Sequence, residues 1–410
     1  MTDLVSAIDT VWVAFAAALI FLMEGGFALL ESGFIRKKNS ISVVAKIMVD
    51  IIVGGLAFYI VGYGIMQGVN NGWFGFGIAL VEPSITLTIP KTLFWFMQMG
   101  FAVAAISIVS GAVLERMKIW VYALFVFLFV AFIYPVASSW IWNSGGWLAK
   151  LGFNDFAGSA AVHAVGGAAA CASAMVLGPR LGKYNKNGKS NVFPGHNLTL
   201  AATGTFLLWF GWFGFNPGST LQAVGQWNMI GQVTMNTFLA SVAGGFATLT
   251  YTQFRYGKID ISMVMNGILA GLVAITAGCN VVSPVSALMI GLIAGVIVDI
   301  GVVTIDKMKI DDPVGAVAVH GVNGIWGTIA VGLFAAQGGL FTSGELRLLG
   351  VQTGGVFAVT VFSFGLTYII LSILKKTVGI RVSQETEVKG IDLAEFGAET
   401  YPSSHTGGMS

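Results

Sequence analysis

Long apolar stretches separated by short polar connections recur along the whole chain. A helix needs about 20 largely apolar residues to cross the hydrocarbon core of a bilayer. The stretches predict eleven transmembrane helices, at 10–33, 41–66, 92–114, 118–142, 157–179, 196–216, 229–254, 260–279, 283–304, 316–335 and 350–375. Acidic Asp3 and Asp9 precede the first stretch, where a signal peptide would carry basic residues. The pattern therefore predicts an all-α integral membrane protein whose first apolar stretch is already a span.

Composition agrees with a chain whose solvent is mostly lipid. Of its 410 residues, 56% are apolar and 10% are charged, against about 25% charged in an average soluble protein. The net charge is +2 and no basic cluster is interleaved with aromatic residues, so we expect no nucleic-acid partner. Cys171 and Cys279 lie inside apolar stretches and have no ligand-like spacing. We expect no disulfide, no metal site and no cofactor.

Basic residues are distributed unevenly between the two sides of the predicted bundle. Seventeen of the 21 Lys and Arg residues fall in the odd-numbered connections or the tail, and three fall in the even-numbered connections. The remaining one, Lys46, lies within a span. Because cytoplasmic segments carry the excess of Lys and Arg, we expect the N-terminus outside and the C-terminus in the cytoplasm, in a multi-pass protein of the cell membrane.

Two segments of the chain align without gaps at an offset of 157 residues. Residues 155–167 match residues 312–324 at seven of thirteen positions, including an Asp and a His in each. The offset joins the fifth predicted span to the tenth, which run in opposite directions, and such inverted repeats are typical of transporters. The repeat divides the chain into a first five-helix unit 1–179, a second unit 180–335, an eleventh helix within 336–375 and a tail 376–410.

The histidines of this repeat are the first candidates for chemistry. Each lies about 12 Å along its helix from the matching Asp, at 1.5 Å per residue. His163 and His320 therefore approach the middle of the bilayer from opposite faces. An ionisable residue inside a span suggests function, although a pair satisfied by neighbouring helices remains an alternative. Only two ligands are in view for a metal, and Asp155 lies two turns from His163, too far for a hydrolytic triad.

We therefore expect a pore rather than an enzyme. Two imidazoles in contact between apolar walls form a narrow polar track for a small hydrogen-bonding solute, or a relay for a proton. Trp142, Phe215 and Ser219 all fall at the outer face. A Trp ring attracts a desolvated cation by about 2 kcal/mol, and a Ser hydroxyl can accept a hydrogen bond from it. An interfacial aromatic belt explains most membrane Trp residues, and on spacing alone it is the preferred interpretation.

Several motifs together resemble one family. They are Asp155–Ser159 with Val162-His163, Trp212–Ser219, Asp311–Pro313, Val319–Gly321 and Gly111–Arg116. Over nearly its full length the chain resembles the ammonium transporter (Amt/Mep/Rh) family. The resemblance implies an eleven-helix protomer made of two inverted five-helix repeats plus an eleventh helix, assembled as a homotrimer with one pore in each protomer. It implies conduction of ammonia, or ammonia plus a proton, and it makes ammonium and methylammonium the expected substrates.

The resemblance also assigns roles to individual residues. Phe101, Trp142 and Ser219 would form the outer recruitment site for ammonium, and Phe101 with Phe215 would form a stacked gate. His163 and His320 would line the pore beneath it. Asp155 would shape the outer site without touching substrate. A PII-type signalling protein would bind the cytoplasmic face, with support from the tail.

Some positions depart from the family pattern. Glu24 stands where many relatives carry Gln, and it shares a helix face with Glu31. Lys46 and Asp50 on the second span could offset one of these charges, and we prefer a structural charge network to a second substrate site. Phe396 replaces a frequent His in the tail, and the loop after Trp142 is longer than in some relatives.

Two further functions remain open on the same scaffold. An ammonium-binding sensor would need a signalling domain, for which the 35-residue tail is short. An Rh-type gas channel would not need an outer Trp–Ser cation site.

Overall fold

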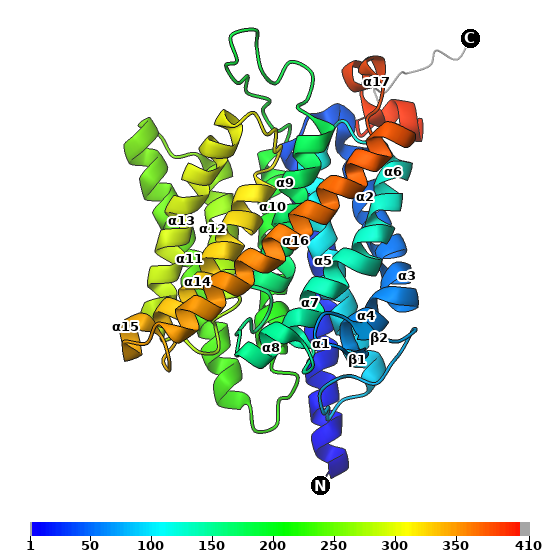
Figure 1. Cartoon of the computed structure of the whole chain (residues 1–410). Coiled ribbons are helices and arrows are strands. Elements are labelled where there is room, and N and C mark those ends of the chain that lie inside the picture. The colour runs from blue at the N-terminus through cyan, green and yellow to red at the C-terminus, as the bar shows by residue number, and fades with distance from the viewer. Residues whose placement is uncertain (1, 402–410) are drawn as a thin grey trace, which may run out of the picture.

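The computed structural model describes residues 2–401, so the last part of the predicted tail, 402–410, lies outside the described residues. The chain forms one bundle of long helices that run in roughly parallel and antiparallel directions (Figure 1). The start of α1 and the tail helix α17 lie at opposite ends of the bundle. Nine helices in the described part are long and apolar enough to cross a membrane. The predicted all-α architecture is confirmed.

Most of the long helices are continuous, and some contain wider π-helical segments. In the first half they are α1 Thr2–Phe34, α2 Ser40–Val49 to α4 Tyr63–Gln67, α5 Lys91–Val113, α6 Ile119–Leu128 with α7 Tyr134–Trp142, and η5 Ser159–Ala164 with α9 Val165–Leu177. In the second half they are α10 Leu198–Gly218, α11 Trp227–Tyr256, α12 Ile261–Ile275, α13 Pro284–Lys307, η6 Val317–Val322 with α14 Asn323–Phe334, and α16 Arg347–Thr377.

Smaller elements connect the long helices. A two-stranded hairpin, β1 Val69–Asn70 with β2 Gly75–Phe76, and the short helices α8 Trp147–Leu151 and α15 Leu340–Ser343 lie at the end where α1 begins. At the other end are η1 Lys37–Asn39, α17 Gln384–Lys389 and η7 Asp392–Phe396. Between α2 and α4, the π-helical segments η2 Asp50–Gly54 and η3 Phe58–Gly62 flank α3 Gly55–Ala57. Another π-helical segment, η4 Phe129–Ile133, joins α6 to α7. The sequence did not predict the hairpin.

One predicted span ends early. The apolar stretch 260–279 predicts a helix of 20 residues, but α12 stops at Ile275. The backbone carbonyls that follow accept hydrogen bonds from another segment and not from α12. Thr276 O accepts from Ala157 N at 3.2 Å, and Ala277 O accepts from Phe156 N at 3.0 Å. These bonds join the end of α12 to the loop that leads into η5. The predicted boundary at 279 is therefore wrong, because a tertiary contact competes with the helix for its hydrogen bonds.

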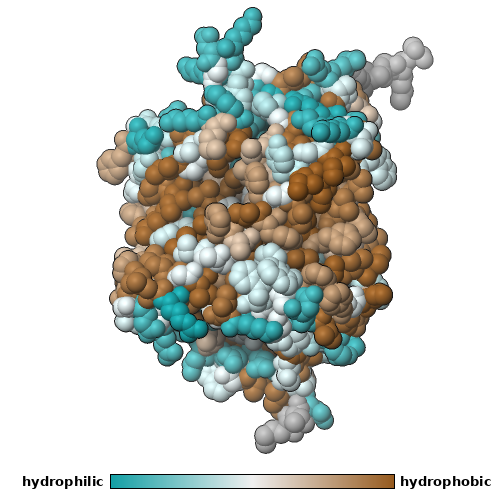
Figure 2. Space-filling model, viewed as in Figure 1, coloured by the Kyte–Doolittle hydropathy of each residue, from teal (hydrophilic) through white to brown (hydrophobic). Residues whose placement is uncertain are grey.

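Hydropathy divides the surface into three bands. Figure 2 shows a brown apolar band around the middle of the visible face and teal polar residues toward both ends. Large aromatic side chains such as Phe206, Phe246 and Phe357 are exposed on α10, α11 and α16. Exposed apolar area on this scale marks contact with lipid or with another protein.

The two segments of the repeat make equivalent contacts. Asp155 accepts hydrogen bonds from the backbone nitrogens of Gly158, Ala160 and Ala161 at 2.8–3.0 Å. Asp312 accepts from Ala316 at 3.0 Å and from Val317 at 2.8 Å. Each Asp thus caps the helix that carries its histidine, where backbone N–H groups would otherwise lack partners.

Candidate functional site

The two repeat histidines meet inside the bundle. His163 lies in η5 and His320 in η6, and their side chains are only 2% and 5% exposed. Their Nδ1 atoms are 3.1 Å apart, and the ring centroids are 5.2 Å apart with the planes inclined at 22°. Because two hydrogen-bonded ring nitrogens share one proton, one ring donates and the other accepts.

Aromatic rings form the walls beside this pair. The His163 ring stacks on Trp212 at 5.2 Å and on Phe215 at 5.6 Å, and Phe27 lies 6.1 Å from His320. Trp212 donates its indole N–H to Thr276 Oγ1 at 2.9 Å, so its polar atom is satisfied. The sequence assigned no role to Trp212 or Phe27. Within the described residues, His163 Nε2 is buried without a hydrogen-bond partner, so it remains available to a solute.

Asp155 does not contact the histidines through its side chain. It holds the start of η5 by the three backbone bonds described above, and Gly158 in that turn has φ +114°, which favours glycine. Burial raises the pKa of Asp155 more than these hydrogen bonds lower it, so the pKa is about 6. Burial similarly raises the pKa of Asp312 to about 6. The predicted structural place of Asp155 thus has a geometric basis in helix capping.

Three predicted outer-site residues line one cavity. Phe101, Trp142 and Ser219 border a space of about 110 Å³, together with Gln98. The Phe101 and Trp142 centroids are 5.7 Å apart, and Ser219 Oγ donates to Phe215 O at 2.9 Å, which leaves its lone pairs free to accept. Trp142 donates its indole N–H to Asp155 O at 2.7 Å. Two aromatic faces and hydroxyl lone pairs suit a small cation with N–H donors.

The sequence missed Gln98 in this cavity. Its Oε1 is buried and lacks a hydrogen-bond partner within residues 2–401. It lies on α5 three residues before Phe101, so both side chains occupy one helix face. A polar residue inside an apolar run at that spacing was the available signal.

Phe101 and Phe215 separate the cavity from the histidines. Their centroids are 4.5 Å apart with the planes at 77°, so the pair is edge-to-face and the expected stacked arrangement is wrong. The same Phe215 ring stacks on His163. On the far side of the pair, a space of about 10 Å³ touches His320, Phe27 and Glu31. The cavity, the aromatic pair, the two histidines and the small space thus touch one another in that order, which makes this series the candidate path.

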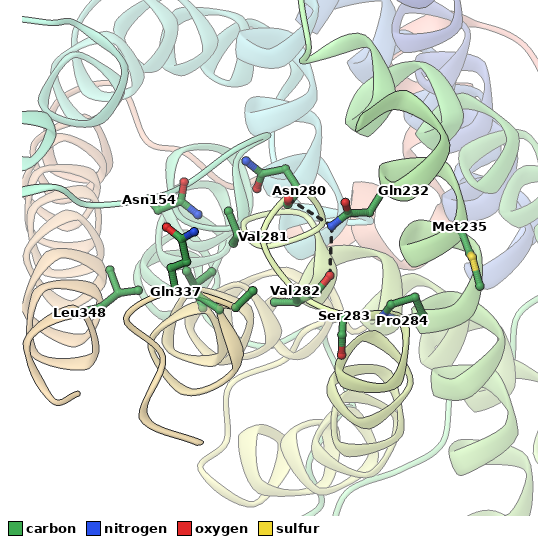
Figure 3. A pocket seen from close by; sticks show the side chains of 13 residues that line it. Asn154, Gln232, Met235, Asn280, Val281, Val282, Ser283, Pro284, Gln337 and Leu348 are labelled. Carbon is green, nitrogen blue, oxygen red and sulfur yellow. Dashed lines mark hydrogen bonds between the residues drawn. The ribbon is translucent and has the colours of Figure 1, made fainter. Parts of the chain in front are cut away.

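A larger cavity lies away from this path. Its volume is about 790 Å³, and it lies between the ends of α11, α13, α14 and α16 (Figure 3). Amide side chains line it, including Asn154, Asn280 and Gln337, and Gln232 donates to the carbonyls of Asn280 and Val282 at 3.2 and 3.3 Å. It contains none of the predicted site residues.

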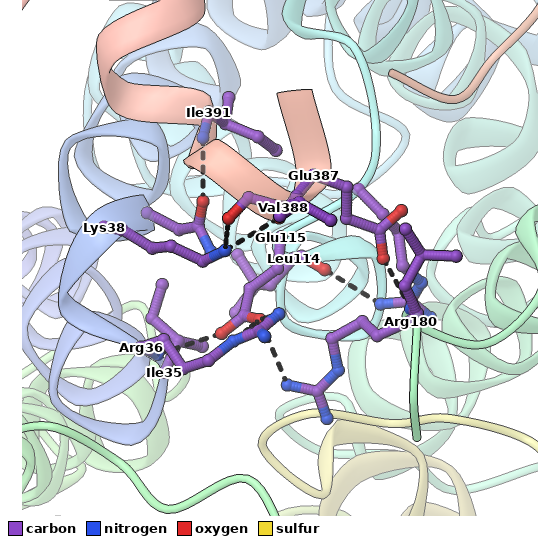
Figure 4. A network of polar contacts seen from close by, with 12 residues as sticks. Ile35, Arg36, Lys38, Leu114, Glu115, Arg180, Glu387, Val388 and Ile391 are labelled. Atoms are coloured by element: carbon purple, nitrogen blue, oxygen red, sulfur yellow. Dashed lines mark hydrogen bonds and ion pairs between the residues drawn. The ribbon is translucent and has the colours of Figure 1, made fainter. Parts of the chain in front are cut away.

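An ion network lies near the end of α1, which Figure 1 places opposite its start, and Figure 4 draws the residues of the network. Buried Glu115 accepts from Arg36 Nε at 2.7 Å and lies 3.6 Å from Arg180. Arg180 also donates to both carboxylate oxygens of Asp311, at 2.8 and 2.9 Å. Burial alone would raise the pKa of Asp311, but the bonds and charge of Arg180, together with Arg116, lower it well below its usual range.

The described part of the tail binds to the same network. Glu387 pairs with Arg381 at 2.8 Å and accepts from Leu181 N at 2.6 Å, while Lys38 donates to the Glu387 carbonyl at 2.8 Å. Asp392 accepts from the backbone nitrogens of Ile41 and Ser42, at the start of α2. Val382 N also donates to Arg116 O at 3.0 Å, so residues 381–392 contact the connections before α2, α6 and α10.

Comparison with known proteins gives consistent matches over nearly the whole chain. The model of the Ammonium Transporter Family matches residues 11–401. Ammonium transporter Amt2 of Archaeoglobus fulgidus is 43% identical, and the match covers 96% of this chain and 88% of that protein. Ammonium transporter 1 member 1 of Arabidopsis thaliana is 35% identical, over 91% of this chain and 81% of that protein.

Solved structures give the same result. One described as "Sensor Amt Protein" has a TM-score of 0.92 and 41% identity, and the match covers 97% of this chain and 100% of that one. Candida albicans Mep2 has a TM-score of 0.85 and 30% identity, over 92% of this chain and 87% of that one.

Proposed function

Because this chain belongs to the ammonium transporter family, we propose that it recruits ammonium at the outer aromatic cavity and conducts ammonia, alone or with a proton, past the paired histidines. Methylammonium is the expected analogue substrate. The observation that carries the proposal is the buried contact of His163 with His320, whose Nδ1 atoms are 3.1 Å apart.

The outer cavity suits the cation and the inner path suits the neutral solute. Ammonium gains from the faces of Phe101 and Trp142 and can donate hydrogen bonds to oxygen atoms of Ser219 and Gln98. Beyond the Phe101–Phe215 pair the walls are apolar, and a bare ion there loses its hydration. Ammonia has both donors and an acceptor, so it can hydrogen-bond to the two imidazoles in turn. A sodium or potassium ion finds no ring of oxygen ligands.

The architecture completes this proposal. To the nine apolar helices we add α11 and α12, which gives eleven spans. They are arranged as inverted repeats 1–179 and 180–335, an eleventh helix in 336–375 and a tail 376–410. The N-terminus lies outside and the tail lies in the cytoplasm of a cell-membrane protein. The exposed aromatic side chains of α10 and α11 support assembly as a homotrimer.

Regulation through the tail is part of this proposal. A PII-type signalling protein is the proposed cytoplasmic partner. The binding of residues 381–392 to the connections before α2, α6 and α10 supports this, since a partner on that face would meet the tail and the connections together. The proposed activity is transport and not catalysis.

The alternatives fit the geometry less well. An Rh-type gas channel has no use for a cation cavity with the oxygen acceptors of Ser219 and Gln98. An ammonium-binding sensor is the second candidate, and one structural neighbour carries the word sensor in its name. A sensor on this scaffold would bind ammonium without sustained flux, so a transport assay separates the two functions.

The decisive experiment is current measurement on reconstituted protein. Proteoliposomes on a solid-supported membrane receive pulses of ammonium, sodium or potassium, and methylammonium uptake is measured in parallel. We expect a response to ammonium and methylammonium only. His163→Ala and His320→Ala should alter it, while His196→Ala, which changes a histidine outside the pore, should not. Unchanged uptake in both pore variants would remove the pore role.

A further inference from the structure

Three carboxyl groups and one amine are buried in the first half of the bundle. Glu24 and Glu31 come from α1, Lys46 from α2 and Asp50 from η2, and none is more than 3% exposed. Three negative charges cannot be balanced by one positive charge in a region of low dielectric. At least two of the carboxyl groups must therefore carry a proton when Lys46 is charged.

The hydrogen bonds show where one negative charge resides. Asp50 accepts from the Tyr122 hydroxyl at 2.7 Å and lies 3.1 Å from Ser107 Oγ. Ser107 Oγ also lies 2.7 Å from Glu24. A hydroxyl has one proton, so both Ser107 contacts are hydrogen bonds only if one carboxyl group donates. Because Asp50 alone also accepts a hydrogen bond from Tyr122, we assign the negative charge to Asp50 and the acid that donates to Ser107 to Glu24.

Glu31 differs from the other two because its surroundings satisfy either protonation state. Ser110 Oγ lies 2.7 and 2.8 Å from the two Glu31 oxygens and 2.8 Å from the Ser107 carbonyl. When Glu31 is ionised, the Ser110 hydroxyl donates to it. When Glu31 is protonated, it donates to Ser110 Oγ, and the hydroxyl turns to the Ser107 carbonyl. Only hydrogen atoms move between the two states.

Glu31 also borders the pore. It lines the same space of about 10 Å³ as His320, which is room for about one water molecule. Phe27, one helical turn earlier on α1, packs against the His320 ring. Phe27 and Glu31 therefore present one face of α1 to the path beyond the histidine pair.

We propose that Glu31 is a proton-exchanging residue of the pore, a role that rests on the proposed function. Ammonium gives a proton to a ring nitrogen of the histidine pair and continues as ammonia. At rest Glu31 is, with Glu24, a neutral acid of the cluster, and it releases its proton to water on the far side. The imidazolium passes its own proton through a water in the small space to the carboxylate so formed, so the Glu31 acid and the neutral imidazole are both restored. The hydroxyl of Ser110 stabilises the transient carboxylate.

The substitution Glu31→Gln tests this role in the full-length protein. Gln keeps a donor and an acceptor for Ser110 but cannot release a proton. Methylammonium uptake and solid-supported-membrane current are measured on the same proteoliposomes. General acid–base transfer contributes about 10²–10⁴-fold to a rate, so we expect current per methylammonium to fall by about tenfold or more. Glu24→Gln is the matched control, since it alters a carboxyl group in the same cluster away from the small space, and its ratio should stay at the wild-type value.

The outcomes separate this proposal from the proposed function. An unchanged ratio of current to uptake in Glu31→Gln, with the histidine variants impaired, overturns the role of Glu31 alone. Uptake by the wild type without any current overturns it as well. If Glu31→Gln does not elute as folded protein from size exclusion, Glu31→Asp replaces it. Because Asp retains an ionisable group, its ratio should stay closer to that of the wild type than to that of Glu31→Ala, which should lose the current.

Discussion

Gly167 lies directly against Gly321, the residue that follows His320. A Cβ atom on Gly167 would overlap the Gly321 backbone nitrogen. The equivalent residue of the second repeat, Gly324, packs in the same way on Ala164, where a Cβ would come within 2.7 Å of the backbone nitrogen. The two histidine-bearing helices therefore cross at glycines, and this close approach sets the separation of the rings.

The substitution Gly167→Ala should disturb this crossing. Overpacking typically costs about 1–3 kcal/mol, and here it would push η6 and its histidine away from His163. We expect a lower thermal unfolding midpoint in detergent and reduced methylammonium uptake. Gly350→Ala on α16 is the control, because no atom lies within 4 Å of the added methyl group. Equal behaviour of the two variants would argue against a packing role at Gly167.

Trp142→Leu should weaken ammonium recruitment more than it weakens folding. A desolvated cation–π contact is worth about 2 kcal/mol, so the ammonium concentration for half-maximal current should rise by about tenfold or more. Trp120→Leu is the control, since Trp120 is 84% exposed on α6. Loss of assembly and transport in equal measure would favour the interfacial-belt interpretation.

Gln98→Leu should also raise the ammonium concentration for half-maximal current. It removes an acceptor from the outer cavity, and hydrogen bonds to charged groups contribute about 1.5–3 kcal/mol. The change should be about tenfold. Gln232→Leu, which alters the separate amide-lined cavity, should leave that concentration unchanged. A Gln98 variant with wild-type concentration dependence would remove Gln98 from the recruitment site.

The buried pair of Asp311 with Arg180 should make stability depend on pH. Since the folded-state pKa of Asp311 is lowered, its contribution is fully present above the unfolded pKa of about 3.9. The contribution is lost as pH falls through the lower, folded-state value. Asp311→Asn should lose about 3 kcal/mol at pH 7, because it removes the closer partner of buried Arg180 and leaves only Glu115 at 3.6 Å. Its unfolding curve should approach that of the wild type below about pH 4.

A second variant controls for the loss of charge itself. Asp306 pairs with Lys183 at 3.1 Å and is 32% exposed. Asp306→Asn should cost at most about 1 kcal/mol, as expected for a surface pair. Unfolding midpoints measured in detergent between pH 3 and pH 7 would compare all three proteins. A pH-independent difference between Asp311→Asn and the wild type would contradict the linkage.

Sequence was sufficient for the helices and for the relation between the histidines. A span is a local property of some 20 residues, so the apolar runs predicted most helices well. The matching Asp and His at one offset related two distant segments before any contact was known. The functional roles of Phe101, Trp142, Asp155, Phe215 and Ser219 stay predictions, although Phe101, Trp142 and Ser219 line one cavity.

Features that depend on non-local contacts could not be predicted. The early end of α12 depends on hydrogen bonds from Phe156 and Ala157, more than 100 residues away in the chain. The place of Gln98 in an apolar run marks it as unusual, but its unpaired oxygen in the cavity depends on how α5 packs. Glu31 was expected in a structural charge network, and its place beside His320 depends on how α1 packs on η6. The π-helical turns that carry both histidines leave no periodic signal in so short a segment.

The shared proton of the histidine pair breaks the symmetry of the fold. The backbones of the two halves are equivalent around His163 and His320, yet at any moment one half supplies the donor and the other the acceptor. The protein therefore exists as two isomers that differ only in where one hydrogen sits. Interconversion requires a proton to arrive at one outer ring nitrogen and another to leave from the opposite one. Each proton that passes between the two outer ring nitrogens therefore exchanges the donor and acceptor roles of the two rings, while no heavy atom has to move.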